Sequence, residues 1–171
     1  ELLEAIDMAR AAGLRRLKLY FMTGLPGEGD ADTLAIARLA REARSRLPGG
    51  SLSLSIAPFV PKAHTPFQWS AMADAAVLDT RLRGLRRELR PLGIAVEEES
   101  VPWSRVQGAL ARGDGRLAAV IERMAGPALA GWRSALAAEG LAEEEFLRSR
   151  GADEPFPWEA VASGVSRAYL W

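Results

Sequence analysis

The pattern of apolar and polar positions predicts alternating helices and strands over the first 100 residues. Apolar residues recur at helical spacing in three stretches, and three apolar runs of strand length lie between or after them. The helices are expected at residues 1–12, 31–47 and 74–90, and the strands at residues 14–23, 51–59 and 94–98. A strand–helix–strand order favours parallel pairing of the first two strands.

The second expected strand has one apolar face and one face of small residues. Leu52, Leu54 and Ile56 alternate with serines and an alanine, and successive side chains of a strand point to opposite faces. Two arrangements fit this alternation. The small face lines the lumen of a barrel and leaves room for a ligand, or it faces solvent in an antiparallel sheet.

The chain is expected to have two parts. Residues 1–100 carry the strand–helix pattern, whereas residues 101–171 show short helical patterns that glycines and prolines interrupt. The sequence also lacks a starting methionine and begins inside a helical pattern, so we expect further residues before Glu1.

Composition excludes several classes of chemistry. The chain has no cysteine and one histidine, His64, which rules out disulfides, a cysteine nucleophile, a thiolate metal site and a site with several histidines. Equal numbers of basic and acidic residues, 22 each, argue against nucleic-acid binding, which usually needs a basic excess. No apolar run approaches membrane length and no signal peptide is visible, so the sequence favours a cytoplasmic location.

Three stretches could carry chemistry. The turn GLPGEGD at residues 24–30 follows an expected strand and opens a helix, where α/β proteins bind ligands, or it is only a plain connecting turn. The segment 57–69 is rich in proline and aromatic residues and offers Lys62 and His64 as polar groups, or serves only as a structural loop. The arginines of helix 74–90 face solvent, or alternatively bind phosphate or RNA.

Two strings of residues resemble a known family. KLYFMTGLPGE at residues 18–28 and LSIAPFVPKAHTPFQW at residues 54–69 are similar to the later part of radical S-adenosylmethionine (SAM) enzymes. More narrowly, they resemble an uncharacterised bacterial radical SAM family whose members often carry a cobalamin-binding-like N-terminal domain. ALARGDGRLAAVI at 109–121 and PFPWEAVASGV at 155–165 resemble the C-terminal region of that family.

The resemblance implies an α/β fold, the last βα units of a partial (βα)6 radical SAM barrel, followed by a small helical appendage. In such enzymes a 4Fe-4S cluster held by a CxxxCxxC loop cleaves SAM reductively, and this chain lacks that loop. The chain would therefore contribute the adenosyl side of the SAM pocket and part of the substrate wall, without catalytic residues or metal ligands of its own and without activity alone. The residues expected to contact SAM are Met22, Gly24, Leu25, Pro58, Phe59 and Val60.

The expected partners follow from the same resemblance. They are the N-terminal half of the same polypeptide with its cluster, SAM, a substrate of unknown identity and, as a further candidate cofactor, cobalamin. A chain without its first βα units would leave a bare strand edge, which favours self-association. The alternative function is a protein- or RNA-interaction module that uses the segment 57–69 and the arginine-rich helix.

Overall fold

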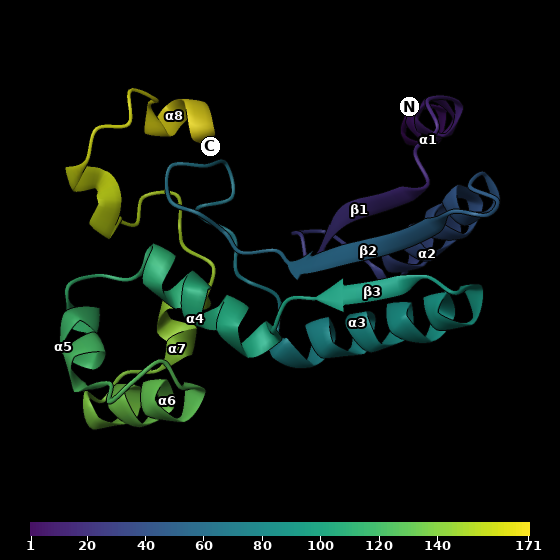
Figure 1. The fold of residues 1–171 in the computed structure, drawn as a ribbon. Coiled ribbons are helices and arrows are strands. Elements are labelled where there is room, and N and C mark those ends of the chain that lie inside the picture. The colour runs from purple at the N-terminus through teal and green to yellow at the C-terminus, as the bar shows by residue number, and fades with distance from the viewer. The chain divides into compact units, whose positions relative to one another are not determined.

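The protein, described by a computed structural model of residues 1–171, divides into two compact units (Figure 1). The first unit combines Glu1–Pro58 with Asp74–Ser100, and the second combines Phe59–Ala73 with Val101–Trp171. The proline- and aromatic-rich segment that follows the second strand thus belongs to the second unit.

The first unit contains the helices and strands that the apolar pattern predicts. Its elements are α1 (Leu2–Ala11), β1 (Arg16–Thr23), α2 (Asp30–Ser45), β2 (Ser51–Pro58), α3 (Ala75–Leu89), the 3-10 helix η1 (Arg90–Leu92) and β3 (Ala95–Glu98). Glycines in the left-handed conformation end two of these helices, Gly13 after α1 and Gly93 after η1.

The three strands form one parallel sheet in the order β1–β2–β3, and their arrows point the same way in Figure 1. Arg16 lies opposite Ser51, and the register continues to Thr23 opposite Pro58. The predicted parallel pairing of the first two strands is confirmed, and the antiparallel alternative is wrong.

The prediction of a partial (βα)6 barrel is also wrong. The sheet is open, with β1 at one edge and β3 at the other, and only its α/β class agrees with the expectation. The alternation of leucine and serine in β2 describes which side of one strand is apolar. Closure depends on the number of strands and on their stagger, which such an alternation does not specify.

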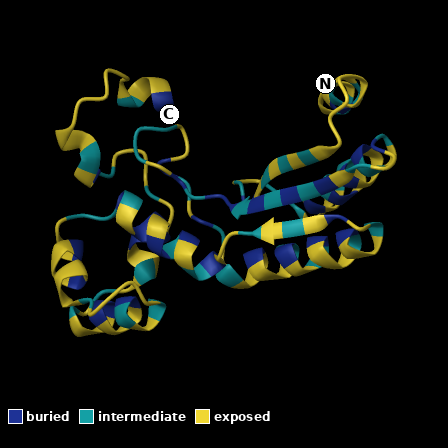
Figure 2. Cartoon of the chain, in the orientation of Figure 1, coloured by how far each residue is buried: buried dark blue, intermediate teal, exposed yellow.

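The core of the first unit lies on one face of the sheet. Burial alternates along β2, whose residues Leu52, Leu54 and Ile56 are buried (Figure 2). Helices α2 and α3 pack against each other and along the sheet. The leucine stripe of α3, which consists of Leu78, Leu82, Leu85 and Leu89, is buried, and four of the five arginines at positions 81–90 are exposed.

The opposite face of the sheet has no covering helix within the first unit. Tyr20 and Met22 of β1 are 75 % and 52 % exposed. Lys18 of β1 donates to Glu97 of β3 at 2.5 Å, and this hydrogen bond raises the pKa of Lys18. The bridge crosses β2 where its side chains are serines, which are small enough to let it pass. Parallel sheets are normally covered on both faces, so this face is suited to contact with further polypeptide or a ligand.

The second unit is helical apart from its loops. It contains α4 (Val101–Arg112), α5 (Arg116–Arg123), α6 (Leu129–Ala138), α7 (Glu143–Leu147), the 3-10 helix η2 (Pro157–Ala160) and α8 (Arg167–Leu170). Its main apolar cluster gathers Val106, Val120 and Phe146 around Trp132, whose Nε1 donates to Glu143 at 2.8 Å. No helix in the chain has both the length and the apolar composition needed to cross a membrane.

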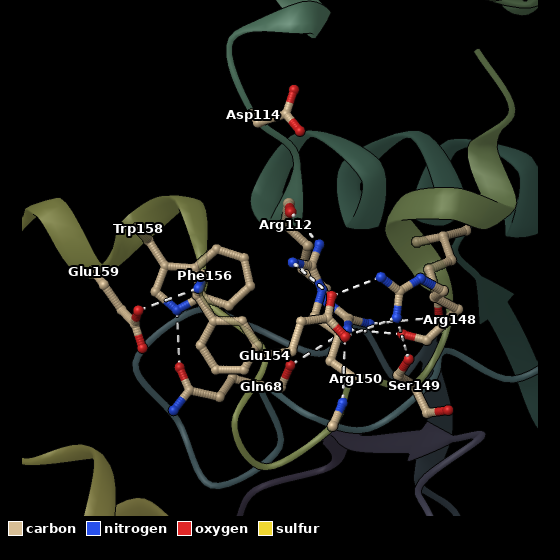
Figure 3. Close-up of polar contacts among 12 residues, drawn as sticks. Gln68, Arg112, Asp114, Arg148, Ser149, Arg150, Glu154, Phe156, Trp158 and Glu159 are labelled. Carbon is tan, nitrogen blue, oxygen red and sulfur yellow. Dashed lines mark hydrogen bonds and ion pairs between the residues drawn. The ribbon is translucent and has the colours of Figure 1, made fainter.

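A buried arginine joins the segments of the second unit (Figure 3). Arg112 is 0 % exposed and donates to the backbone oxygens of Ser70 at 2.8 Å, Arg148 at 2.9 Å and Gln68 at 3.3 Å. Burial, together with nearby Arg150, lowers the pKa of Arg112 to about 10, which leaves the guanidinium charged at neutral pH. These hydrogen bonds hold the loop Phe59–Ala73 against the segment that follows α7.

We predict that Leu85→Ala lowers the free energy of unfolding by about 2–5 kcal/mol. Leu85 is fully buried on the inner face of α3, and truncating its side chain leaves a cavity. Val77→Ala on the same helix removes an exposed side chain and is expected to change stability by less than about 0.5 kcal/mol. Denaturant titration measures both. Equal effects would show that the leucine stripe does not pack as described.

Replacing Arg112 by methionine should cost about 3–5 kcal/mol, since the carbonyl groups of Gln68, Ser70 and Arg148 lose their buried donor. Arg133→Met makes the same change at an exposed position of α6 and should be nearly neutral. Thermal or chemical unfolding that ranked the two variants equally would contradict the role given to Arg112.

Candidate functional site

The turn after β1 has a backbone that requires glycine. Gly24 and Gly27 have φ of +91° and +81°, in the left-handed region that residues with a Cβ rarely adopt. Between them, Leu25 and Pro26 carry the chain from the carboxyl end of β1 toward α2. This is the edge at which ligands of α/β proteins bind.

The carboxylate of Glu28 closes this turn from inside. One oxygen, Oε2, accepts hydrogen bonds from the backbone amides of Gly24 at 2.6 Å and Leu25 at 2.9 Å. The other, Oε1, accepts from the hydroxyl groups of Thr23 at 2.7 Å and Thr33 at 3.3 Å. The side chain of Glu28 is only 7 % exposed, so these donors replace water.

Arg81 of α3 supplies the positive charge that balances Glu28. Its Nη1 lies 3.2 Å from Glu28 Oε1, and its Nη2 donates to the backbone oxygen of Glu28 at 2.8 Å. These donors and the guanidinium of Arg81 offset the cost of burying the Glu28 side chain. The pair also ties α3 to the turn after β1.

This arrangement changes what the turn can offer to a ligand. The amides of Gly24 and Leu25 already donate to Glu28, so they are not free for an adenine edge or a phosphate. Both oxygens of Glu28 are fully engaged, which makes Glu28 a structural group rather than a general base. No group of three or more histidine, cysteine, aspartate or glutamate side chains is placed to hold a metal ion.

An open, largely apolar depression of about 410 Å³ adjoins the turn. Its lining includes Met22, Leu25, Pro26 and Ile36. Pro58 lies one strand away, opposite Thr23 in the β1–β2 register. The structure thus brings four of the six expected SAM contacts, Met22, Gly24, Leu25 and Pro58, to the carboxyl edge of β1 and β2.

The other two expected contacts, Phe59 and Val60, belong to the second unit. Phe59 is buried, and its ring meets that of Phe67 edge-on with centroids 5.0 Å apart. Val60 lies close to Gly108 of α4. Both side chains contribute to packing inside that unit.

The segments named for the alternative interaction function are buried in part. In the proline- and aromatic-rich segment Pro61 and Trp69 are buried, and Lys62 is exposed. His64 has a positive φ of 57°, and its backbone amide donates to Gln68. Among the exposed arginines of α3, Arg86 is paired with Glu98. A protein- or RNA-binding surface on these segments stays a prediction.

Sequence reasoning missed the pairing of Glu28 with Arg81. Helical spacing places Arg81 next to the leucine stripe, because it lies three residues after Leu78 and four before Leu85. It therefore borders the buried stripe of α3 and can reach inward. Nothing local in the sequence identifies its partner, since the two residues are 53 positions apart.

Comparison with known proteins gives one distant relative. The chain is 29 % identical over 127 residues to the uncharacterized protein MJ0966 of Methanocaldococcus jannaschii, a match that covers 74 % of the chain and 28 % of the relative. The chain thus spans less than a third of that protein's length. No family model matches the chain, and no solved structure matches it. These comparisons assign no activity.

We predict that Glu28→Gln destabilises the protein by about 1–3 kcal/mol although it preserves size, because the new amide places an N–H donor against groups that themselves donate. Asp30→Asn makes the same chemical change at an exposed side chain two residues away and should cost less than about 0.5 kcal/mol. Chemical denaturation measures the difference. A neutral Glu28→Gln would show that the carboxylate does not hold the turn.

Proposed function

We propose that this chain is part of a longer, cytoplasmic radical SAM enzyme and contributes one wall of its SAM site. The wall is the carboxyl edge of β1 and β2, with Met22 and the apolar depression beside Leu25. The observation that carries the proposal is the position of these residues: they end adjacent parallel strands and lie on or beside a sheet face that the first unit leaves uncovered. The resemblance of residues 18–28 and 54–69 to radical SAM enzymes supplies the reaction class.

The residues of this chain do not fit an iron–sulfur cluster. The chain has no cysteine and no other set of side chains able to hold a metal. In this proposal the cluster is held elsewhere in the longer polypeptide, and no residue of this chain takes part in breaking a bond. The chain alone is then catalytically silent.

For the adenosyl group of SAM, the chain offers mainly apolar surface, and Asp32 is the one exposed carboxylate in the lining of the depression. Glu28 faces inward, and the neighbouring amides are occupied, so a nucleoside meets the thioether of Met22 and the apolar side chains of Leu25 and Pro26. Apolar contact with the face of a base is one way in which proteins hold aromatic ligands. Ala57 of β2 lies opposite Met22 in the register, and its small side chain leaves space beside Met22.

We predict that Met22→Glu weakens SAM binding to the longer polypeptide by about tenfold or more, because it places a carboxylate in an apolar wall. Met22 is the position to change, since Gly24 has φ +91° and any side chain there would strain the turn itself. Isothermal titration after anaerobic reconstitution with iron and sulfide measures the affinity.

Val77→Glu is the matched control, because it introduces the same group at another exposed apolar position of the first unit. Unchanged affinity in Met22→Glu would remove this edge from the SAM site. Failure of the reconstituted wild-type protein to form 5′-deoxyadenosine with a strong reductant would overturn the reaction class.

A further inference from the structure

The second unit contains a pocket of about 150 Å³ between the loop Phe59–Ala73 and the last residues of the chain. Its lining includes His64 and Gln68 from the loop, and Trp158, Ser163, Arg167 and Leu170 from the C-terminal segment. At about 30 Å³ per water molecule, the space suits a ligand with only a few non-hydrogen atoms. Local sequence patterns do not predict this pocket, because its two walls are about 90 residues apart.

The orientation of the Gln68 side chain is fixed by its neighbours. Its oxygen, Oε1, accepts hydrogen bonds from the His64 backbone amide at 3.2 Å and from Trp158 Nε1 at 2.9 Å. Both partners can only donate, so the reversed amide would place N–H groups against each other. The amide nitrogen therefore lies on the side away from Trp158, as Figure 3 shows.

The amide nitrogen of Gln68 lacks an acceptor in the protein. The oxygen uses both of its partners, Gln68 is only 3 % exposed, and it lines the pocket. A donor that is fixed in this way in the lining of a pocket favours a ligand that presents an acceptor atom.

The rest of the lining points to the class of ligand. The ring of His64 adds a nitrogen that can donate. The hydroxyl of Ser163 already bonds with Val165, and the guanidinium of Arg167 already donates to Glu159 and to backbone oxygens. The one carboxylate in the lining, that of Glu159, is already paired with Arg167. Val161, Val165 and Leu170 supply apolar walls.

We propose that this pocket binds a short-chain carboxylate. One carboxylate oxygen accepts a hydrogen bond from Gln68 Nε2, and the hydrocarbon chain packs against Val161 and Leu170. The proposal is independent of the SAM site, because every residue that it uses belongs to the second unit.

The amide resonances of glutamine provide a direct test with the 171-residue chain. The sequence has two glutamines, Gln68 and Gln107, and no asparagine, so proton–nitrogen NMR shows only two side-chain amide pairs. Titration with butanoate should shift the Gln68 pair and the Trp158 indole signal saturably. The exposed Gln107 pair on α4 should stay in place.

Butanamide, which has the same shape without the charge, should bind about tenfold more weakly, since a hydrogen bond to an ionised acceptor is the stronger one. Gln68→Glu keeps an oxygen for His64 and Trp158 but replaces the inward donor by a second oxygen, and it should abolish butanoate binding. Gln107→Glu makes the same charge change outside the pocket and should bind as wild type.

Three results would overturn the proposal. They are a Gln68 pair that does not move saturably, butanamide binding as tightly as butanoate, and Gln68→Glu binding as tightly as wild type. If Gln68→Glu does not fold, the comparison of butanoate with butanamide on the wild-type protein still tests whether the pocket prefers a carboxylate.

Discussion

The carboxylate of Glu28 is the constraint on which the first unit depends. It gathers donors from the end of β1, from the turn, from α2 and, through Arg81, from α3. A charge buried this deeply is tolerated only when its partners are all in place, so the turn has one stable conformation and not several. The turn at the carboxyl edge of the sheet is consequently held in place, and the amides of Gly24 and Leu25 serve the fold and not a ligand.

The two faces of the sheet have different roles in the first unit. The apolar face packs on α2 and α3 and supplies the stability, while the uncovered face carries small or polar residues on β2 and exposed Tyr20 and Met22 on β1. The ion pair between Lys18 and Glu97 fixes two side chains on this uncovered face but does not cover the face. Helices of the first unit cover only one face of this parallel sheet. This is consistent with the proposal that the chain is part of a longer polypeptide and contributes to its SAM site.

Local patterns predicted the elements of the first unit, and non-local contacts limited what could be said of the site. The stripe of α3 and the alternation in β2 report their faces within a few residues, which is why helices, strands and parallel pairing were all expected. Barrel closure was not predictable, because strand number and stagger belong to the whole sheet. Likewise, nothing near Phe59 reveals that the chain leaves one unit for the other after Pro58.

The course of the chain has a consequence for any attempt to divide the protein. Because the first unit resumes at Asp74 after an excursion through Phe59–Ala73, the two units are connected by three chain crossings rather than one. A cut after Ser100 would not release an independent first unit. It would leave Trp69 attached without Phe156, its ring neighbour, and Gln68 and Ser70 without the guanidinium of Arg112. The units are therefore separable in space but not in sequence, and neither is transferable as a single continuous segment.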